Sequence, residues 1–138
     1  MSTPQDLALR DAVRGIDLFK KVNVPILGMV QNMSTFVCTN CGHEHDVFGL
    51  DGMLPREQSS PYLDAARARC ADRYSTGARR KCEELKITLL GDIPLHSQIC
   101  ADADAGRPTV VSHPDGVQAE AFRRIAGQLL TLLDLPPR

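Results

Sequence analysis

The sequence predicts an α/β domain: a parallel sheet with flanking helices, of which only part lies within these 138 residues. Three observations predict it: helical periodicity over residues 4–21, a nearly continuous apolar run at 24–30, and a second apolar run at 87–91. Apolar runs without polar alternation are typical of strands buried on both faces, as in parallel sheets. A crossover helix needs a strand on both sides, and no strand precedes the first helix here. We therefore expect the sheet to be incomplete.

Composition limits the classes of function. The chain is long enough for one domain with a core, and its 43% apolar and 24% charged residues are ordinary values. A net charge of −1 and an isoelectric point near 6.4 indicate no nucleic-acid partner. No apolar run approaches the roughly 20 residues that cross a bilayer. Five cysteines, only two of which share a motif, favour a reducing compartment over a disulfide scaffold.

The first helix should span about residues 4–21. Thr3 can cap it, Pro4 suits the first helical position, and Asp6 lies near the positive end of the helix. The apolar residues that then recur at helical spacing are Leu9, Ala12, Val13, Ile16 and Phe19.

Two buried strands follow from the apolar runs. The first spans 24–30, with Pro25 at its first position, where a missing N–H is tolerated. The second spans 87–91. Both are expected to be buried, and the first is expected to be a central strand of a parallel sheet.

The C-terminal part reads as mainly helical. A short helix is expected at 97–105, ending at Gly106, and residues 109–111 could form a short edge segment. Asp115 is a plausible cap for the last helix, which Pro136 and Pro137 end. The apolar face of that helix comprises Phe122, Ile125, Ala126, Leu129 and Leu133.

Residues 53–77 differ from the rest of the domain. They are rich in Arg, Ser, Ala and Asp, and Pro55 and Pro61 interrupt them. Core periodicity is weak, so we interpret this segment as a surface insertion in a single domain that spans residues 1–138.

Cys38-x-x-Cys41, followed by Gly42, has the spacing of a metal-binding knuckle. A thioredoxin-like redox pair would need a helix start, which the following residues do not favour. A zinc site would need two more ligands, and His43 and His45 are the nearby candidates. Two copies of the chain would instead supply four thiolates to one [4Fe–4S] cluster. Two inert cysteines in a loop remain an alternative, and the spacing alone does not name the metal.

The other cysteines, Cys70, Cys82 and Cys100, are isolated in sequence. We expect Cys82 and Cys100 to act as small apolar residues, and Cys70 lies in the interpreted insertion. No Ser/His/Asp or Cys/His arrangement is evident, so no catalytic residue is predicted.

Asn32 comes just after the predicted first strand, where open α/β sheets bind ligands. Its amide could read the edge of a base, or could instead cap the turn through its own backbone. The sequence contains no G-x-x-x-x-G-K-[ST] and no other glycine-rich phosphate loop. The sequence therefore lacks the phosphate-binding loop of a nucleotide site.

Six motifs in fixed order resemble one family. They are Thr3-Pro4-Gln5-Asp6, Gly28-Met29-Val30-Gln31-Asn32-Met33-Ser34, Cys38-x-x-Cys41-Gly42, Phe48-Gly49, Leu90-Gly91-Asp92-Ile93-Pro94-Leu95 and Gly106-Arg107-Pro108. Together they resemble the C-terminal half of the Mrp/NBP-type P-loop ATPases, which are iron–sulfur cluster carriers. The mitochondrial NUBPL branch, associated with respiratory complex I assembly, is most similar. The resemblance covers nearly the whole chain outside 53–77.

The resemblance implies a P-loop NTPase-like fold of the deviant Walker A, MinD/Mrp-like type, present here only as its C-terminal part. It implies that Cys38 and Cys41 bind a [4Fe–4S] cluster between two subunits. It also implies that Asn32 contacts adenine and that Pro94 lies in the loop beside the base. The family hydrolyses ATP slowly with Mg²⁺, but its P-loop half is missing, so this chain alone should not be catalytic. The family lacks a segment like 53–77, which points to an insertion.

The resemblance further implies a homodimer formed through the cluster and iron–sulfur apo-protein clients, including complex I subunits. It implies the mitochondrial matrix as location, with the cytoplasm as the alternative. A zinc-knuckle interaction module and a non-functional fragment without the P-loop are the alternative interpretations.

Overall fold

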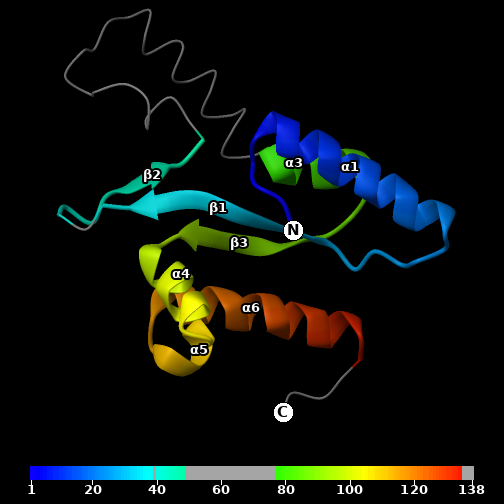
Figure 1. The fold of residues 1–138 in the computed structure, drawn as a ribbon. Helices are drawn as coiled ribbons and strands as arrows, with labels where there is room; N and C mark the ends of the chain where they lie inside the picture. Colours follow the sequence, from blue (N-terminus) through cyan, green and yellow to red (C-terminus); the bar gives the residue numbers. More distant parts are fainter. Residues whose placement is uncertain (39, 49–76, 135–138) are drawn as a thin grey trace, which may run out of the picture.

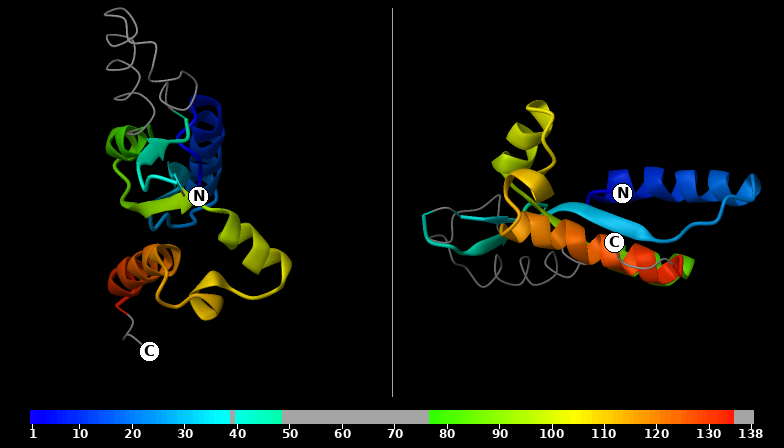
Figure 2. Two further views of the ribbon diagram at one scale, coloured as in Figure 1. Left: turned by 90° about the vertical axis from the view of Figure 1, so that its left-hand side faces the viewer. Right: turned by 90° about the horizontal axis from the view of Figure 1, so that it is seen from below.

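The computed structural model describes residues 1–38, 40–48 and 77–134. A sheet forms the middle layer (Figure 1), with α1 (Asp6–Lys21) and α3 (Gly77–Leu85) on one face. Helix α6 (Val117–Leu132) covers the other face, and the left-hand view of Figure 2 shows the same layers from the side. The predicted α/β fold with flanking helices is therefore confirmed, whereas the interpreted insertion lies outside the described residues except for Gly77.

The sheet has the strand order β2-β1-β3 in the described chain. Strand β1 (Met29–Val37) runs parallel to β3 (Leu89–Leu95), as predicted, and antiparallel to β2 (Glu44–Asp46), which was not predicted. Ser2 adds a single parallel bridge to Gln31. The chain therefore runs from this isolated bridge, which belongs to no named strand, through α1 and into β1.

Helix α1 begins later than predicted. Its N-cap is Gln5, without a side-chain cap, so the expected cap at Thr3 is wrong. The cause is tertiary: the Ser2 N–H donates to the Val30 carbonyl (2.9 Å), which keeps the start of the chain extended. Pro4 is fully buried against Gly77, where an added Cβ would lie 2.7 Å from the Pro4 carbonyl oxygen.

Both central strands are displaced toward the C-terminus relative to the predictions. Val24 and Leu27 are exposed and lie outside the strands, so the expected burial of 24–30 is wrong for its first half. Pairing begins where the Met29 N–H donates to the Thr88 carbonyl (2.8 Å). Strand β3 includes Pro94, which is compatible with its position at an edge of the described sheet.

Of the two short C-terminal helices, one was predicted and the other was not. Helix α4 (Ser97–Asp104) confirms the expected helix, and Gly106 follows it with φ +68°. Residues 109–111, expected as an edge segment, belong instead to the helical turn α5 (Thr109–Ser112). The Pro108 carbonyl accepts hydrogen bonds from the N–H groups of Val111 and Ser112 (2.8 and 3.0 Å), so local bonding overrides β propensity.

The last helix, α6, is confirmed, but Gly116 rather than Asp115 is its N-cap. Its Ile125 packs with Leu90 and Ile93 in a core below the sheet. A second core lies above the sheet and comprises Leu9, Ile16, Met29, Ala78 and Cys82. Among the described residues, no helix has the length and apolar character of a bilayer-crossing segment.

The isolated cysteines follow the predictions only in part. Cys82 is 3% exposed and acts as a small apolar core residue, as expected. Cys100 is exposed on α4, so the expectation that it serves as a core residue is wrong. Its position on the outer side of a short helix was not evident from the sequence.

Candidate functional site: a thiol knuckle beside a polar groove

The cysteine motif lies at the tip of a β-hairpin. Strands β1 and β2 pair Thr35 with Asp46 and Val37 with Glu44, and the intervening turn carries the motif. The tip of this hairpin extends beyond the helices in Figure 1 and in the right-hand view of Figure 2. A ligand held by this turn would therefore face outward.

The turn has the geometry of a metal-binding knuckle. The Cys38 N–H donates to the His43 carbonyl (2.9 Å), and the Gly42 N–H donates to the Cys38 carbonyl (2.8 Å). Gly42 has φ +69°, a conformation that glycine adopts without steric cost. The backbone N–H groups of Cys41 and Asn40 donate to the Cys38 sulfur, and these bonds lower the pKa of the Cys38 thiol. The turn thus favours the thiolate, which is the form that binds metals.

Cys38 is half-buried and Cys41 is exposed, so the two thiols are accessible at the tip. The thiol of Cys41 also hydrogen-bonds to the Cys38 sulfur, which brings the two together. Because the motif lies in a hairpin turn, it lacks the helix N-terminus that a thioredoxin-like pair requires.

The two histidines of the hairpin do not complete a four-ligand site in the described chain. Their rings contact each other edge to face, with 4.7 Å between ring centroids. Within the described ranges, no group of three or more His, Cys, Asp or Glu side chains is placed to hold one ion. A metal bound by Cys38 and Cys41 would therefore need ligands from elsewhere.

Asn32 and Pro94 lie on neighbouring strands. Asn32 lies within β1 rather than after it, pairs with Ile93, and donates its N–H to the Ser2 carbonyl (2.8 Å). Met33 follows with φ +55°, and the register to β3 shifts there. Pro94 lines a groove at this end of the sheet, but Asn32 does not. The two predicted base-contacting residues are thus close in the sheet without sharing that groove.

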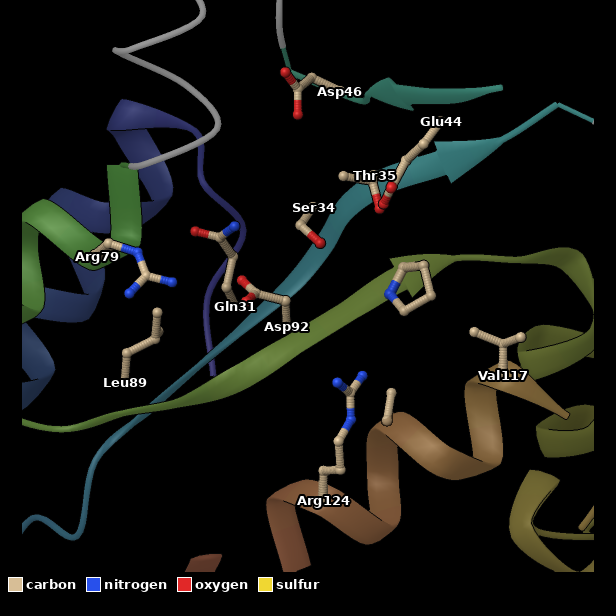
Figure 3. Close-up of a pocket in the computed structure, with 12 residues that line it drawn as sticks. Gln31, Ser34, Thr35, Glu44, Asp46, Arg79, Leu89, Asp92, Val117 and Arg124 are labelled. Atoms are coloured by element: carbon tan, nitrogen blue, oxygen red, sulfur yellow. The ribbon is translucent and has the colours of Figure 1, made fainter. Parts of the chain in front are cut away.

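The groove has a volume of about 320 Å³ and lies at the base of the hairpin (Figure 3). Arg79 of α3 and Arg124 of α6 point into it toward Asp92 of β3. Desolvation raises the pKa of the Asp92 carboxyl, and the two guanidinium groups oppose this shift. The remaining lining residues are Gln31, Ser34, Thr35, Glu44, Asp46, Leu89, Pro94, Val117 and Ala121.

The floor of the groove is held by buried hydrogen bonds. Gln31 is 3% exposed, and its Oε1 accepts the Ala78 N–H (3.3 Å), which ties α3 to β1. The Ser34 hydroxyl donates to the Ile93 carbonyl (3.5 Å) across the two parallel strands. Sequence reasoning missed the groove. Only the polar positions beside the apolar runs, such as Gln31 and Asp92, could have indicated it.

A mixed α/β sheet with flanking helices, in which β1 and β3 are parallel, is consistent with a domain of the nucleotide-binding type, to which a two-cysteine hairpin is added. A sequence profile described as ParA, NUBPL iron-transfer P-loop NTPase, matches residues 1–64 and 64–130. The chain belongs to this family, which confirms the predicted membership.

Similar proteins carry iron–sulfur names. The chain is 39% identical over 137 residues to the iron–sulfur cluster transfer protein NUBPL of Mus musculus, covering 99% of this chain and 35% of the relative. It is 37% identical over 133 residues to the iron–sulfur cluster carrier protein of Haemophilus influenzae, covering 96% and 29%. It is 39% identical over 126 residues to the iron–sulfur protein required for NADH dehydrogenase, mitochondrial, of Arabidopsis thaliana, covering 91% and 32%.

One solved structure shares the fold. The nucleotide-binding protein of Archaeoglobus fulgidus in complex with ADP matches with a TM-score of 0.53 and 24% identity, covering 88% of this chain and 39% of that one. The coverage figures of the three curated relatives show that the chain spans about a third of their length.

Proposed function

We propose that the chain binds and transfers an iron–sulfur cluster as cargo, with Cys38 and Cys41 as its ligands. The observation that carries this proposal is the knuckle, in which backbone N–H groups stabilise the Cys38 thiolate at an exposed tip. Thiolates are the usual ligands of iron–sulfur clusters. The iron–sulfur names of the relatives support the same cargo.

The cargo is a [4Fe–4S] cluster held between two copies of the chain. Such a cluster takes four thiolate ligands, and one knuckle supplies two. Within the described ranges, no group of three or more His, Cys, Asp or Glu side chains is placed to hold one ion, which supports a second molecule as the source of the other ligands. A second copy provides the same pair from the same exposed tip, which makes a symmetric dimer the simplest solution.

Asn32 and Pro94 contribute to a nucleotide site whose phosphate-binding part lies outside these residues. Their places on two neighbouring parallel strands, with Pro94 near the carboxyl end of β3, support this role. In the full-length relatives, ATP with Mg²⁺ would then control cluster loading or release. Titration with adenosine, followed by amide NMR, tests the proposal. Signals of β1 and β3 around Asn32 should shift, and shifts confined to other elements would contradict it.

The clients are iron–sulfur apo-proteins, with subunits of respiratory complex I as the first candidates. The Arabidopsis relative, named as required for NADH dehydrogenase and as mitochondrial, supports both the clients and a location in the mitochondrial matrix. Relatives in bacteria support the cytoplasm as the alternative. Fractionation of cells that express the full-length protein would decide between the two locations.

The deciding experiment is anaerobic reconstitution of the chain with iron and sulfide, followed by metal analysis and size-exclusion chromatography. The parent chain should elute as a coloured dimer with four irons per two chains, and Cys38→Ala should lose the cluster. Cys100→Ala is the matched control, because Cys100 is also exposed but lies on α4, outside the knuckle. Equal cluster content in all three proteins would contradict the proposal.

A zinc-knuckle interaction module is the second candidate, because the same turn geometry suits zinc. It predicts one tightly bound zinc per monomer, no colour, and no change of oligomeric state on loading. Zinc that persists in competition with iron and sulfide would favour this module over the carrier.

A further inference from the structure

The polar groove beside the hairpin has a charge arrangement that cluster binding does not use. Arg79 and Arg124 come from helices on opposite faces of the sheet, yet both guanidinium groups point toward the same carboxyl group, that of Asp92 (Figure 3). Within the part of the chain that the structure describes, neither arginine has an ion-pair partner within 4.0 Å. Two like charges converge here, with one carboxylate nearby but not in contact with either.

The arginines next in sequence, Arg80 and Arg123, instead form ion pairs within their own helices. Arg80 of α3 lies 3.8 Å from Glu84, and Arg123 of α6 lies 3.1 Å from Glu120. Both are half-exposed ion pairs on the helix surface, of the kind that contributes little. In each helix, therefore, one exposed arginine pairs with a glutamate of its own helix, and its neighbour in sequence, also exposed, lines the groove.

We propose that the groove between Arg79 and Arg124 is a binding site for a small anion of the carboxylate or phosphate class, bridged by the two guanidinium groups. The planar guanidinium offers parallel N–H donors that match the oxygens of these anions. Gln31 also lines the groove, and because its Oε1 accepts the Ala78 N–H, its NH₂ group is the part of the amide that can donate.

The size of the groove limits the ligand. A volume of about 320 Å³ is at the lower end for ligand pockets and corresponds to roughly ten water molecules. Inorganic phosphate or a short dicarboxylate fits such a volume. Glu44 and Asp46 lie at the β2 end of the groove, so the anion is expected at the opposite end, between the arginines.

The Asp92 carboxylate opposes anion binding in the proposed site. It lies between the arginines as a partial internal counter-ion, and its carboxylate repels an incoming anion. Removal of this charge should therefore strengthen anion binding, whereas removal of either arginine should weaken it. These opposite signs separate a built site from unspecific attraction to basic residues.

The test is isothermal titration of the full chain with inorganic phosphate and, separately, with succinate, at low ionic strength because salt screens exposed charges. At least one probe should bind. Arg79→Gln and Arg124→Gln should each weaken it about tenfold, the loss expected for a charge-assisted hydrogen bond. Arg80→Gln and Arg123→Gln are the matched controls and should leave the affinity unchanged. Asp92→Asn should bind the probe more tightly.

The two probes distinguish the two sources of anion, since the tighter one names the class. The proposal is overturned if neither probe binds, if the control variants weaken binding as much as the groove variants, or if Asp92→Asn weakens it. The site is independent of the cysteines, so Cys38→Ala should bind the anion like the parent. Loss of cluster binding would therefore leave this proposal standing, and the reverse also holds.

Discussion

Cys38 and Cys82 carry the same side chain in opposite surroundings. At the hairpin tip, backbone N–H groups donate to the Cys38 sulfur and lower the pKa of its thiol. In the core between α1, α3 and the sheet, burial raises the pKa of the Cys82 thiol, with Arg79 opposing the shift. The first environment prepares a thiolate for metal, and the second keeps a neutral, apolar thiol. Reactivity is thus set by neighbouring groups and not by residue type.

The largest expected difference between these cysteines is in alkylation. Native protein treated with iodoacetamide should label Cys38 and Cys41 rapidly, whereas Cys82 should label only through unfolding. Since the unfolded fraction of a stable domain is about 10⁻³ or less, its rate should be at least about a thousandfold lower. Peptide mapping by mass spectrometry measures all sites at once. Cys100 is the internal control for access, and equal labelling of Cys82 and Cys100 would contradict the comparison.

Cys82→Ser should damage the fold and spare the site. The hydroxyl would replace an apolar thiol at a position that is 3% exposed, and burial of a hydroxyl without a partner costs about 1–3 kcal/mol. Urea denaturation should show this loss, while cluster content per folded chain stays at the parental level. Cys100→Ser, at an exposed position, should change stability by less than about 0.5 kcal/mol. Loss of the cluster in folded Cys82→Ser would argue against two separate roles.

Gly42→Ala should weaken the knuckle through its backbone. Nothing lies within 4 Å of an added Cβ, so the cost is conformational, about 1–2 kcal/mol for a positive φ of +69°. Gly127→Ala is the matched control, because Gly127 lies inside α6 with equally open surroundings. That change should stabilise the protein by about 0.5–1 kcal/mol. Chemical denaturation of both variants measures these shifts, and two shifts of the same sign would refute the argument.

The smallest expected effect concerns pH. Because the pKa of Cys38 is lowered, its thiolate persists to lower pH, and its alkylation should decline at lower pH than that of a small reference thiol with a pKa of about 8.5. Cys41→Ala keeps the backbone donors, which contribute most, and loses only the thiol donor. Its profile should therefore move slightly toward higher pH. Alkylation rates measured as a function of pH check both expectations. A pH profile of Cys38 that coincides with that of the reference thiol would contradict the lowered pKa.

The helices were more predictable than the strands. The C-terminal end of α1 and both ends of α4 lie within one residue of the bounds predicted from the sequence. Helical hydrogen bonds are local, so the sequence nearby is enough to predict them. Strand bounds were displaced, since pairing depends on a partner far along the chain, as Met29 with Thr88 shows. Residues 109–111 were predicted as extended from their β-branched character, but the Pro108 carbonyl closes a helical turn.

The site was predictable to a similar, limited degree. Cys38 and Cys41 were identified from spacing alone, because a knuckle is a local structure. Their assignment as cluster ligands, and that of Asn32 and Pro94 as base contacts, stay predictions. The groove was not predictable, because nothing in the sequence separates Arg79 from Arg80 or Arg124 from Arg123. Only the packing of α3 and α6 around β3 directs one arginine of each pair inward.

The sequence by itself therefore determined the fold class and the family, and it predicted the position of the two-cysteine turn, because these follow from local periodicity, ordered motifs and short spacings. The tertiary structure alone decided that burial raises the pKa of the Cys82 thiol, where each strand begins, and which charged groups line the groove. The physical reason is the separation along the sequence of the groups that interact. A turn or helix forms its hydrogen bonds within a few residues, whereas burial, strand register and the electrostatic field at Asp92 arise from groups that only folding brings together.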